Sequence, residues 1–179
     1  DVYYPDSIIA QRWNDVLGHI QVGGGTEDQY RTFYSCLYRA TLFPRKFYEI
    51  DAAGNPVHYS PYNGKICDGY LYTDTGFWDT FRSLFPLLNL VYPSVNREMQ
   101  MGLANIAREN EFLPEWASPG HRGCMVGQNS ASVVADAIVK GVAPQEEWQT
   151  LYDCLVYGTE NVHPEVSSTG RLGHEYYNT

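Results

Sequence analysis

The chain has 179 residues, of which 44% are hydrophobic and 18% charged, which is enough apolar material for one domain with a packed core. Its formal net charge of −9 argues against nucleic acid as a partner, because phosphate binding requires a basic surface. The sequence contains no run of about twenty apolar residues, so we expect no membrane span. The four cysteines match no zinc-binding spacing, and three of them are expected to be small buried residues. The cysteine pattern does not indicate whether the protein functions in an oxidising or a reducing compartment.

Helical periodicity dominates the first part of the chain. We expect a helix over residues 7–17 and, after three glycines, a second helix that begins at an N-cap, Thr26. Glu27 and Asp28 suit the first turn of that helix electrostatically, and it should end near Leu42, just before Phe43-Pro44.

Residues 45–73 form a different kind of segment. Residues 47–51 and 57–60 read as two extended arms, with a turn over 53–56 between them. Prolines and glycines predict an irregular stretch from Pro61 onward. We therefore expect a short excursion resembling a β-hairpin between helices, and long excursions of this kind are often functional.

Helices return after this excursion. We expect a helix over 75–91 and a second helix from an N-cap at Ser94 to about Asn110, followed by an irregular segment over 111–127. A third helix should begin at Asn129 or Ser130 and end at Gly141. A fourth should have Pro144 at its first position and run to about Tyr157, and another helix should start over 176–179.

Paired helices with long loops on one side are typical of an α/α toroid or a solenoid. A closed double ring requires roughly twelve helices, and the periodicity predicts about six or seven. The fold class predicted from this pattern is therefore mainly α, about half of an α/α toroid, with the hairpin-like excursion at 45–73.

A first polar cluster lies around the start of the helix expected over 75–91. Trp78 and Asp79 should point away from the apolar stripe that starts at Phe77, and Asp79 and Arg82 are spaced to pair on one helix face. A stacking ring beside a carboxylate is what a sugar site needs, and Asp74 could accept a sugar hydroxyl or cap the helix. The structural alternative, a core tryptophan with a local ion pair, is equally compatible with the spacing.

A second cluster lies in the loop over 116–127. His121 and Arg122 would serve as donors to a sugar or a carboxylate, or Arg122 would hold the loop through a backbone carbonyl. Glu115, beside Trp116, could be a general acid in an apolar pocket, but a surface glutamate is the simpler interpretation. Asp136 is either a buried orienting acid or a residue facing a polar loop.

Two histidines stand outside both clusters. His58 and His163 lie in loops without a partner at ligand spacing, so they are expected to be structural or exposed.

Five segments together resemble glycoside hydrolase family 92: residues 24–29, 31–38, 77–82, 124–127 and 134–137. The resemblance covers almost the whole chain. It implies a calcium-dependent exo-α-mannosidase, secreted or periplasmic, of the kind used by bacteria to degrade N-glycans and mannan. It also implies an N-terminal β-sandwich followed by an (α/α)6 catalytic toroid.

The resemblance places this chain, residues 1–179, in the first half of that toroid, without the β-sandwich or the second half. The family inverts configuration, using a carboxylic acid and a carboxylate base. Their segments, Gly-Asn-Glu-Pro and a Gly-Asp-Glu-Asp-like run, are missing from this sequence. The Ca²⁺ ligands are expected mainly outside the chain as well, so no catalytic or metal residue is assigned here.

The resemblance assigns Trp78 and Asp79 to the wall of the −1 subsite. It places His121 and Arg122 in a loop that varies within the family and is expected to set the preference for the glycosidic linkage. The sequence therefore predicts an α-mannosidase fragment, most simply α-1,2-specific, that is inactive alone and needs the remainder of the toroid or a second chain. Three alternatives are a non-catalytic mannan-binding module, a helical scaffold fragment, and a six-hairpin glycosidase for another sugar.

Overall fold

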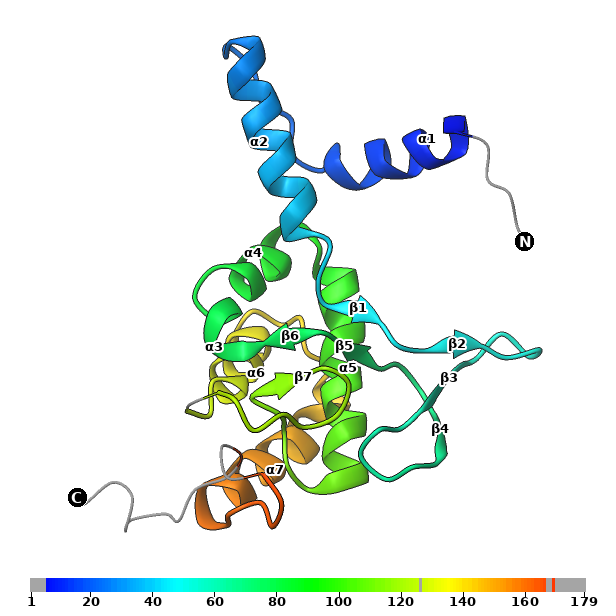
Figure 1. Cartoon of the computed structure of the whole chain (residues 1–179), viewed down its shortest axis with the longest axis vertical. Helices are drawn as coiled ribbons and strands as arrows, with labels where there is room; N and C mark the ends of the chain where they lie inside the picture. Colours follow the sequence, from blue (N-terminus) through cyan, green and yellow to red (C-terminus); the bar gives the residue numbers. More distant parts are fainter. Residues whose placement is uncertain (1–5, 126, 167–168, 170–179) are drawn as a thin grey trace. The chain divides into compact units, whose positions relative to one another are not determined.

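The computed structural model describes residues 6–125, 127–166 and Thr169 (Figure 1). It contains two compact units, Asp1–Phe43 and Pro44–Thr179. The helices expected from the sequence are accompanied by small antiparallel sheets. Among the residues that the structure describes, no helix combines the length and apolar character that crossing a bilayer requires.

The first unit consists of helices α1 (Asp6–Leu17) and α2 (Glu27–Ala40). Thr26 is the N-cap of α2, as predicted. Its side chain accepts a bond from the Gln29 backbone, and the Gln29 side chain accepts one from the Thr26 N–H at 2.8 Å. This reciprocal pair satisfies two N–H groups that the helix start leaves open. The helix ends at Ala40, two residues before the predicted end.

The second unit begins with the predicted excursion. Its strands are β1 (Arg45–Lys46), β2 (Glu49–Ile50), β3 (Pro56–Tyr59), β4 (Ile66–Asp68) and β5 (Tyr72–Thr73). The β2–β3 pair confirms the hairpin, and β4 extends it into a three-stranded antiparallel sheet. The prediction of an irregular stretch after Pro61 was wrong at β4 and β5. These strands pair with partners elsewhere in the chain, which a local pattern does not reveal.

The single helix predicted over 75–91 was also wrong. The segment contains β6 (Thr75–Gly76), α3 (Phe77–Thr80) and, after a break, α4 (Leu84–Val91). The break has a physical cause in Pro86. A continuous helix would place this proline in its interior, where the missing N–H and the ring disrupt the backbone. Beginning α4 at Leu84 places Pro86 in the first turn, where the helix requires no backbone N–H donor.

The long helix α5 (Pro93–Asn110) lies at the centre of the second unit and packs against α4 and α7 (Figure 1). Its N-cap is Tyr92 and its first residue is Pro93, so the prediction that Ser94 caps it was wrong. Proline is favoured at the first helical position, because that N–H has no partner inside the helix. The buried core around α5 includes Phe85, Leu103 and Ile106.

Three further elements complete the unit: α6 (Ser130–Val139), the 3₁₀ turn η1 (Gln145–Glu147) and α7 (Trp148–Glu160). Asn129 is the N-cap of α6, as predicted, and Gly141 follows the helix in a left-handed conformation at φ 70°.

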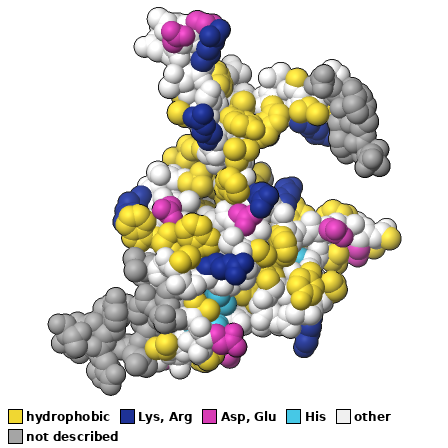
Figure 2. Space-filling model, viewed as in Figure 1, with side chains coloured by type: hydrophobic (Ala, Val, Ile, Leu, Met, Phe, Trp, Pro, Cys, Tyr) yellow, Lys and Arg dark blue, Asp and Glu magenta, His cyan; other side chains and the backbone are white. Residues whose placement is uncertain are grey.

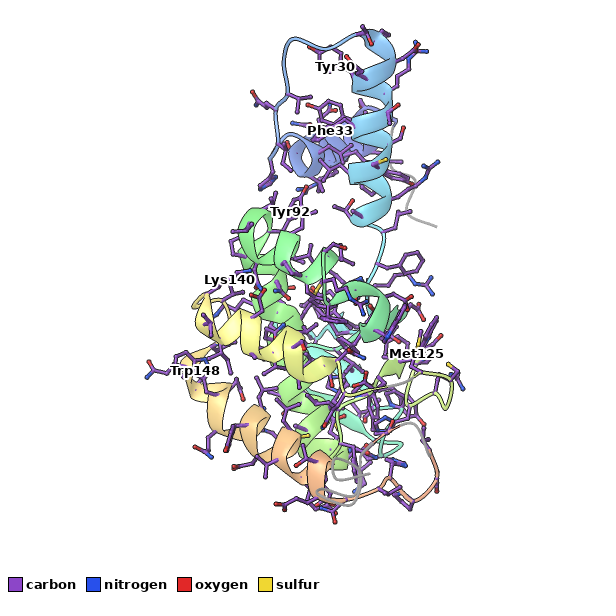
Figure 3. The ribbon with its side chains drawn as sticks, turned by 90° about the vertical axis from the view of Figure 1, so that its left-hand side faces the viewer. Tyr30, Phe33, Tyr92, Met125, Lys140 and Trp148 are labelled. Atoms are coloured by element: carbon purple, nitrogen blue, oxygen red, sulfur yellow. The ribbon has the colours of Figure 1, made fainter. Side chains whose placement is uncertain are left out.

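The connection from α6 to α7 is also packed into the core. Pro144 precedes η1 as its N-cap, one position before the predicted one. Trp148 closes this connection by donating from Nε1 to the Ala143 carbonyl at 3.0 Å (Figure 3). The helix predicted to start at 176–179 lies outside the described residues.

All four cysteines lie in the described part of the chain and are free thiols. Only Cys154 is buried, and burial raises the pKa of its thiol to about 12. Cys36 and Cys124 are exposed and Cys67 is partly buried, so the prediction of three buried cysteines was wrong.

Candidate functional site

The centre of the candidate site is a glycine flanked by a carboxylate and an indole ring. Strand β6 pairs with β7 (Trp116–Ala117), and this pairing sets Gly76 opposite Trp116. Helix α3 starts at the next residue and directs Asp79 back over Gly76. A Cβ atom built on Gly76 would lie 2.6 Å from Oδ2 of Asp79 and 2.9 Å from Cε3 of Trp116. The absence of a side chain therefore allows the carboxylate and the ring to meet.

Trp116 is the residue of this site that sequence reasoning missed. It lies in the second predicted cluster, over 116–127, but His121 and Arg122 are the ligand-binding residues that the sequence predicts there. The pairing of β6 with β7 joins segments about forty residues apart, and neither two-residue strand has a recognisable period. Asp79 is exposed and Trp116 is half-buried. This combination offers an apolar face and open acceptor oxygens to a ligand from solvent.

Trp78 points outward, as predicted, with 42% of its surface exposed. The Arg82 guanidinium lies 4.8 Å from the Trp78 ring centroid and 4.3 Å from that of Phe81. It also donates to the Trp78 carbonyl at 3.1 Å. The predicted pair of Arg82 with Asp79 was wrong: within the described ranges, no ion pair joins these two side chains. The Asp79 carboxylate is therefore not neutralised by Arg82.

Asp74 holds the strands behind the site together. Oδ2 accepts a bond from Nε of Arg45 at 2.6 Å, and Oδ1 accepts one from the Ser118 hydroxyl at 3.3 Å. Its backbone is left-handed, with φ 60°. The alternative of a helix cap was wrong, because the N-cap of α3 is Gly76 and makes no side-chain bond. Asp74 thus links β1 to the loop that carries Trp116.

Glu115 is buried with 1% exposure, so the interpretation as a surface residue was wrong. Its carboxylate accepts from the backbone N–H and side-chain amide of Asn129, at 2.8 and 3.2 Å. It also accepts from the backbone and hydroxyl of Ser130, at 3.4 and 3.1 Å. Burial raises the pKa of Glu115, and these four bonds lower it without fully offsetting the burial.

The Glu115 carboxylate therefore accepts hydrogen bonds at the start of α6, where N–H groups lack partners inside the helix. Its carbonyl accepts the N–H of Phe77 at 2.9 Å. Glu115 thus connects α6, α3 and the Trp116 strand, and both of its oxygens are already engaged by donors. This geometry gives it a positioning role and does not support a role as general acid.

His121 and Arg122 are engaged within their own loop. The His121 ring bonds through Nε2 to Oδ1 of Asn110 at 2.8 Å and lies 4.6 Å from the His163 ring. Burial, with a smaller contribution from His163, lowers the pKa of His121 to about 4. Arg122 donates from Nε to the Ser118 carbonyl at 2.9 Å, which is the loop-holding alternative considered above.

The partly buried His121 predicts an acid-sensitive fold. Its folded pKa of about 4 lies below the unfolded value near 6.5, so between these values the unfolded chain binds a proton that the folded chain does not. The associated stability is complete above about pH 6.5 and is lost as the pH falls towards 4. Between pH 7.5 and 5 the expected loss is about 2 kcal/mol. Urea unfolding at both pH values should show this difference, and His121→Gln should reduce it.

His19→Gln is the matched control, because His19 is exposed in the first unit. This variant should keep the wild-type pH difference. An unchanged difference in His121→Gln would show that other groups cause the acid sensitivity.

The remaining polar candidates are Asp136, His58 and His163. Asp136 accepts from Asn89 at 2.7 Å and from Lys140 at 2.8 Å. Burial alone would raise the pKa of Asp136, but these two partners outweigh it and lower the pKa. His58 and His163 are both buried, so the alternative that they are exposed was wrong. The Nδ1 atom of His163 accepts two backbone N–H bonds, each 3.1 Å long.

Among the described residues, no three acidic side chains lie close enough together to form a calcium site. Calcium takes about six to eight oxygen ligands. The group of three or more potential metal ligands that the described part of the chain brings together is His58, Cys67 and Glu109. It contains a single carboxylate beside an imidazole and a thiol, and this donor set does not suit calcium.

Comparison with known proteins agrees with the resemblance in the sequence. Residues 7–179 match the model of the glycosyl hydrolase family 92 catalytic domain. A secreted glycosidase of Arthroderma benhamiae, described as uncharacterized, is 26% identical over 166 residues, covering 90% of this chain and 17% of that protein.

Two solved structures resemble the fold. The GH92 inverting mannosidase BT2199 of Bacteroides thetaiotaomicron is 50% identical, with a TM-score of 0.90 over 96% of this chain. The GH92 α-mannosidase BT3965 of the same organism, solved in complex with mannoimidazole, is 27% identical, with a TM-score of 0.74 over 84% of this chain. The chain spans 23% and 20% of these two proteins. It belongs to glycosyl hydrolase family 92, whose members are glycoside hydrolases, and matches the catalytic domain of that family.

Proposed function

We propose that the protein containing this chain is an exo-acting α-mannosidase that hydrolyses terminal mannose with inversion, and that this chain supplies one wall of the sugar site. The observation that carries the proposal is the meeting of Asp79 and Trp116 over Gly76. The 50% identity to an inverting mannosidase supports the reaction and the sugar.

The chemistry of the two side chains fits a pyranose. A carboxylate accepts hydrogen bonds from two adjacent hydroxyl groups of a sugar, and these charge-assisted bonds are stronger than neutral ones. An indole ring offers a flat apolar face for the C–H groups of the ring. Figure 2 shows apolar side chains beside both acidic and basic ones on one face of the second unit, the mixture that a neutral polyol requires.

The other candidates surround this pair in the proposal. Trp78, with Arg82 stacked on it, provides an exposed aromatic edge beside Asp79. Asp74 acts through Arg45 and Ser118, and His121 and Arg122 act through the shape of their loop. An α-1,2 preference on N-glycans or mannan is the linkage that we propose.

The toroid is part of the same proposal. Residues 1–179 would form the first half of an (α/α)6 domain, with a β-sandwich and the second half supplied by the remainder of the protein or by a second chain. Exposed apolar residues support it: Leu90 on α4 and Val139 on α6 are 73% and 86% exposed, so helix surfaces remain to be covered. A secreted or periplasmic location is proposed from the secreted fungal relative.

The calcium ligands are proposed to lie in the rest of the protein, because the group of potential ligands in the described residues does not suit calcium. The catalytic acid and base are also proposed to lie in the rest of the protein, since the Glu115 carboxylate already accepts hydrogen bonds and Asp74 is paired with Arg45. These engaged carboxylates also favour the second candidate, a non-catalytic mannan-binding module, because binding by Asp79 and Trp116 requires no acid–base pair.

Hydrolysis of aryl α-mannosides separates these functions. The full-length protein should release the aryl group from the α-mannoside, lose this activity in a chelator and regain it with Ca²⁺. The 179-residue chain alone should release none. Mannoside binding without turnover by the full-length protein would favour the binding module, and preferred turnover of α-glucosides would refute the mannosidase.

A further inference from the structure

Three potential metal ligands from distant parts of the second unit meet at one point. The register of β3 and β4 places His58 opposite Cys67, and Glu109 reaches them from the last turn of α5. One ligand atom from each residue lies within 4.8 Å of the others. The side chains of His58 and Glu109 are 0% and 8% exposed. The group is therefore enclosed by the fold and is not a chance assembly of surface side chains.

The hydrogen bonds of His58 leave a place for a cation. Nδ1 lies 2.8 Å from the Gly69 carbonyl oxygen, which can only accept, so Nδ1 carries the proton. In a neutral ring, Nε2 is then a bare lone pair, and it lies 2.9 Å from Oε1 of Glu109. Two acceptor atoms come this close only when a proton or a metal ion lies between them. A carbonyl bond that fixes the ring in this way is a regular feature of metal-binding histidines.

Two further observations favour a metal over the ring proton. The second carboxylate oxygen of Glu109, Oε2, is buried and has no hydrogen-bond partner. A single proton between Nε2 and Oε1 would leave Oε2 unpaired, which is costly in the interior, whereas a metal ion can bind both carboxylate oxygens. The Cys67 sulfur lies beside the pair, 3.6 Å from the Asn63 side-chain nitrogen and 3.9 Å from both Oδ1 of Asn63 and the Lys65 carbonyl oxygen. A divalent cation would be neutralised by the thiolate and the carboxylate together.

We propose that His58, Cys67 and Glu109 bind a divalent cation of the zinc type, with water as the fourth ligand. Imidazole, thiolate and carboxylate are the ligands of zinc, whereas calcium and magnesium take oxygen alone. Binding would draw the donor atoms closer together than 4.8 Å, and Cys67 and Glu109, which are only partly buried as whole residues, would make most of this adjustment. The ion would clamp the β3–β4 hairpin to the end of α5 and would be separate from the calcium of the sugar site.

Cobalt provides a direct probe, because Co²⁺ bound by a thiolate gives a charge-transfer absorption in the near ultraviolet. The purified protein is stripped with a chelator, dialysed and titrated with Co²⁺ and then Zn²⁺. We expect one Co²⁺ per chain with the thiolate band, its displacement by one Zn²⁺, and a higher Tm in the zinc form.

The variants test the ligands. Cys67→Ser should abolish the band, and Cys67→Ser and Glu109→Gln should each weaken Zn²⁺ binding by about 100-fold or more, since even supporting residues cost about 10–100-fold. Cys124→Ser, which removes an exposed thiol elsewhere, should leave both unchanged. Glu109→Gln can be compared with Cys67→Ser by circular dichroism, to ensure that both are folded.

The absence of the band in the wild-type protein would overturn the proposal and leave a His58–Glu109 ion pair. A band that survives in Cys67→Ser, or disappears in Cys124→Ser, would also overturn it. None of these results depends on mannosidase activity, so failure here would leave the proposed function untouched.

Discussion

Asp79→Ala is expected to lower kcat/KM of the full-length protein for an aryl α-mannoside by about 10³-fold. The Asp79 carboxylate lies open to solvent at the Trp116 ring and is not paired with Arg82. Each hydrogen bond from a sugar hydroxyl to a charged acceptor contributes about 1.5–3 kcal/mol, and two such bonds account for the expected loss. Steady-state kinetics on wild type and variant measure it.

Asp153→Ala is the matched control, because Asp153 is an exposed aspartate on α7 away from the site residues. It should retain wild-type kinetics. The Tm of Asp79→Ala should also stay near that of wild type, since the side chain is exposed and buries no partner. A kcat/KM within about threefold of wild type, below the effect of one such bond, would remove Asp79 from the sugar site.

Glu115→Ala should lower the free energy of unfolding by about 3–4 kcal/mol. The carboxylate is buried, and its removal would leave donors of Asn129 and Ser130 without partners and open a cavity at the start of α6. Lost caps cost about 1 kcal/mol, and each buried unsatisfied donor about 1–3 kcal/mol. Urea unfolding of the purified protein measures the change.

Glu115→Gln should lower the free energy of unfolding by about half as much, because the amide oxygen of the glutamine still accepts the hydrogen bonds made to one carboxylate oxygen. Glu146→Ala is the control: its side chain is 67% exposed and contacts Arg97 at 3.4 Å, and such pairs contribute about 0–1 kcal/mol. A loss below about 1 kcal/mol in Glu115→Ala would contradict the positioning role, because a single lost cap would already cost that much.

Local signals predicted much of the fold. The Thr26 cap, the hairpin at 47–60 and the end of α6 at Gly141 each depend on residues a few positions apart, and the structure confirms them. The prediction of one helix over 75–91 was wrong because it followed the apolar stripe and did not include the effect of Pro86, which disrupts a helix interior.

The site was less accessible from sequence, because its parts meet through long-range pairing. Asp79 was found through its neighbours, whereas Trp116 required the β6–β7 register. The group of His58, Cys67 and Glu109 was missed for the same reason: no local spacing links two strands to the end of a helix forty residues later. Glu115 was misjudged because burial of a glutamate depends on the donors that the rest of the fold supplies.

The most direct measurement is a crystal structure of the full-length protein with mannoimidazole bound. We predict the Asp79 carboxylate within about 3.2 Å of two hydroxyls of the inhibitor, and the Trp116 ring within about 4.5 Å of its carbon atoms. An inhibitor bound elsewhere, without contact to either residue, would contradict the assignment of this wall to the sugar site.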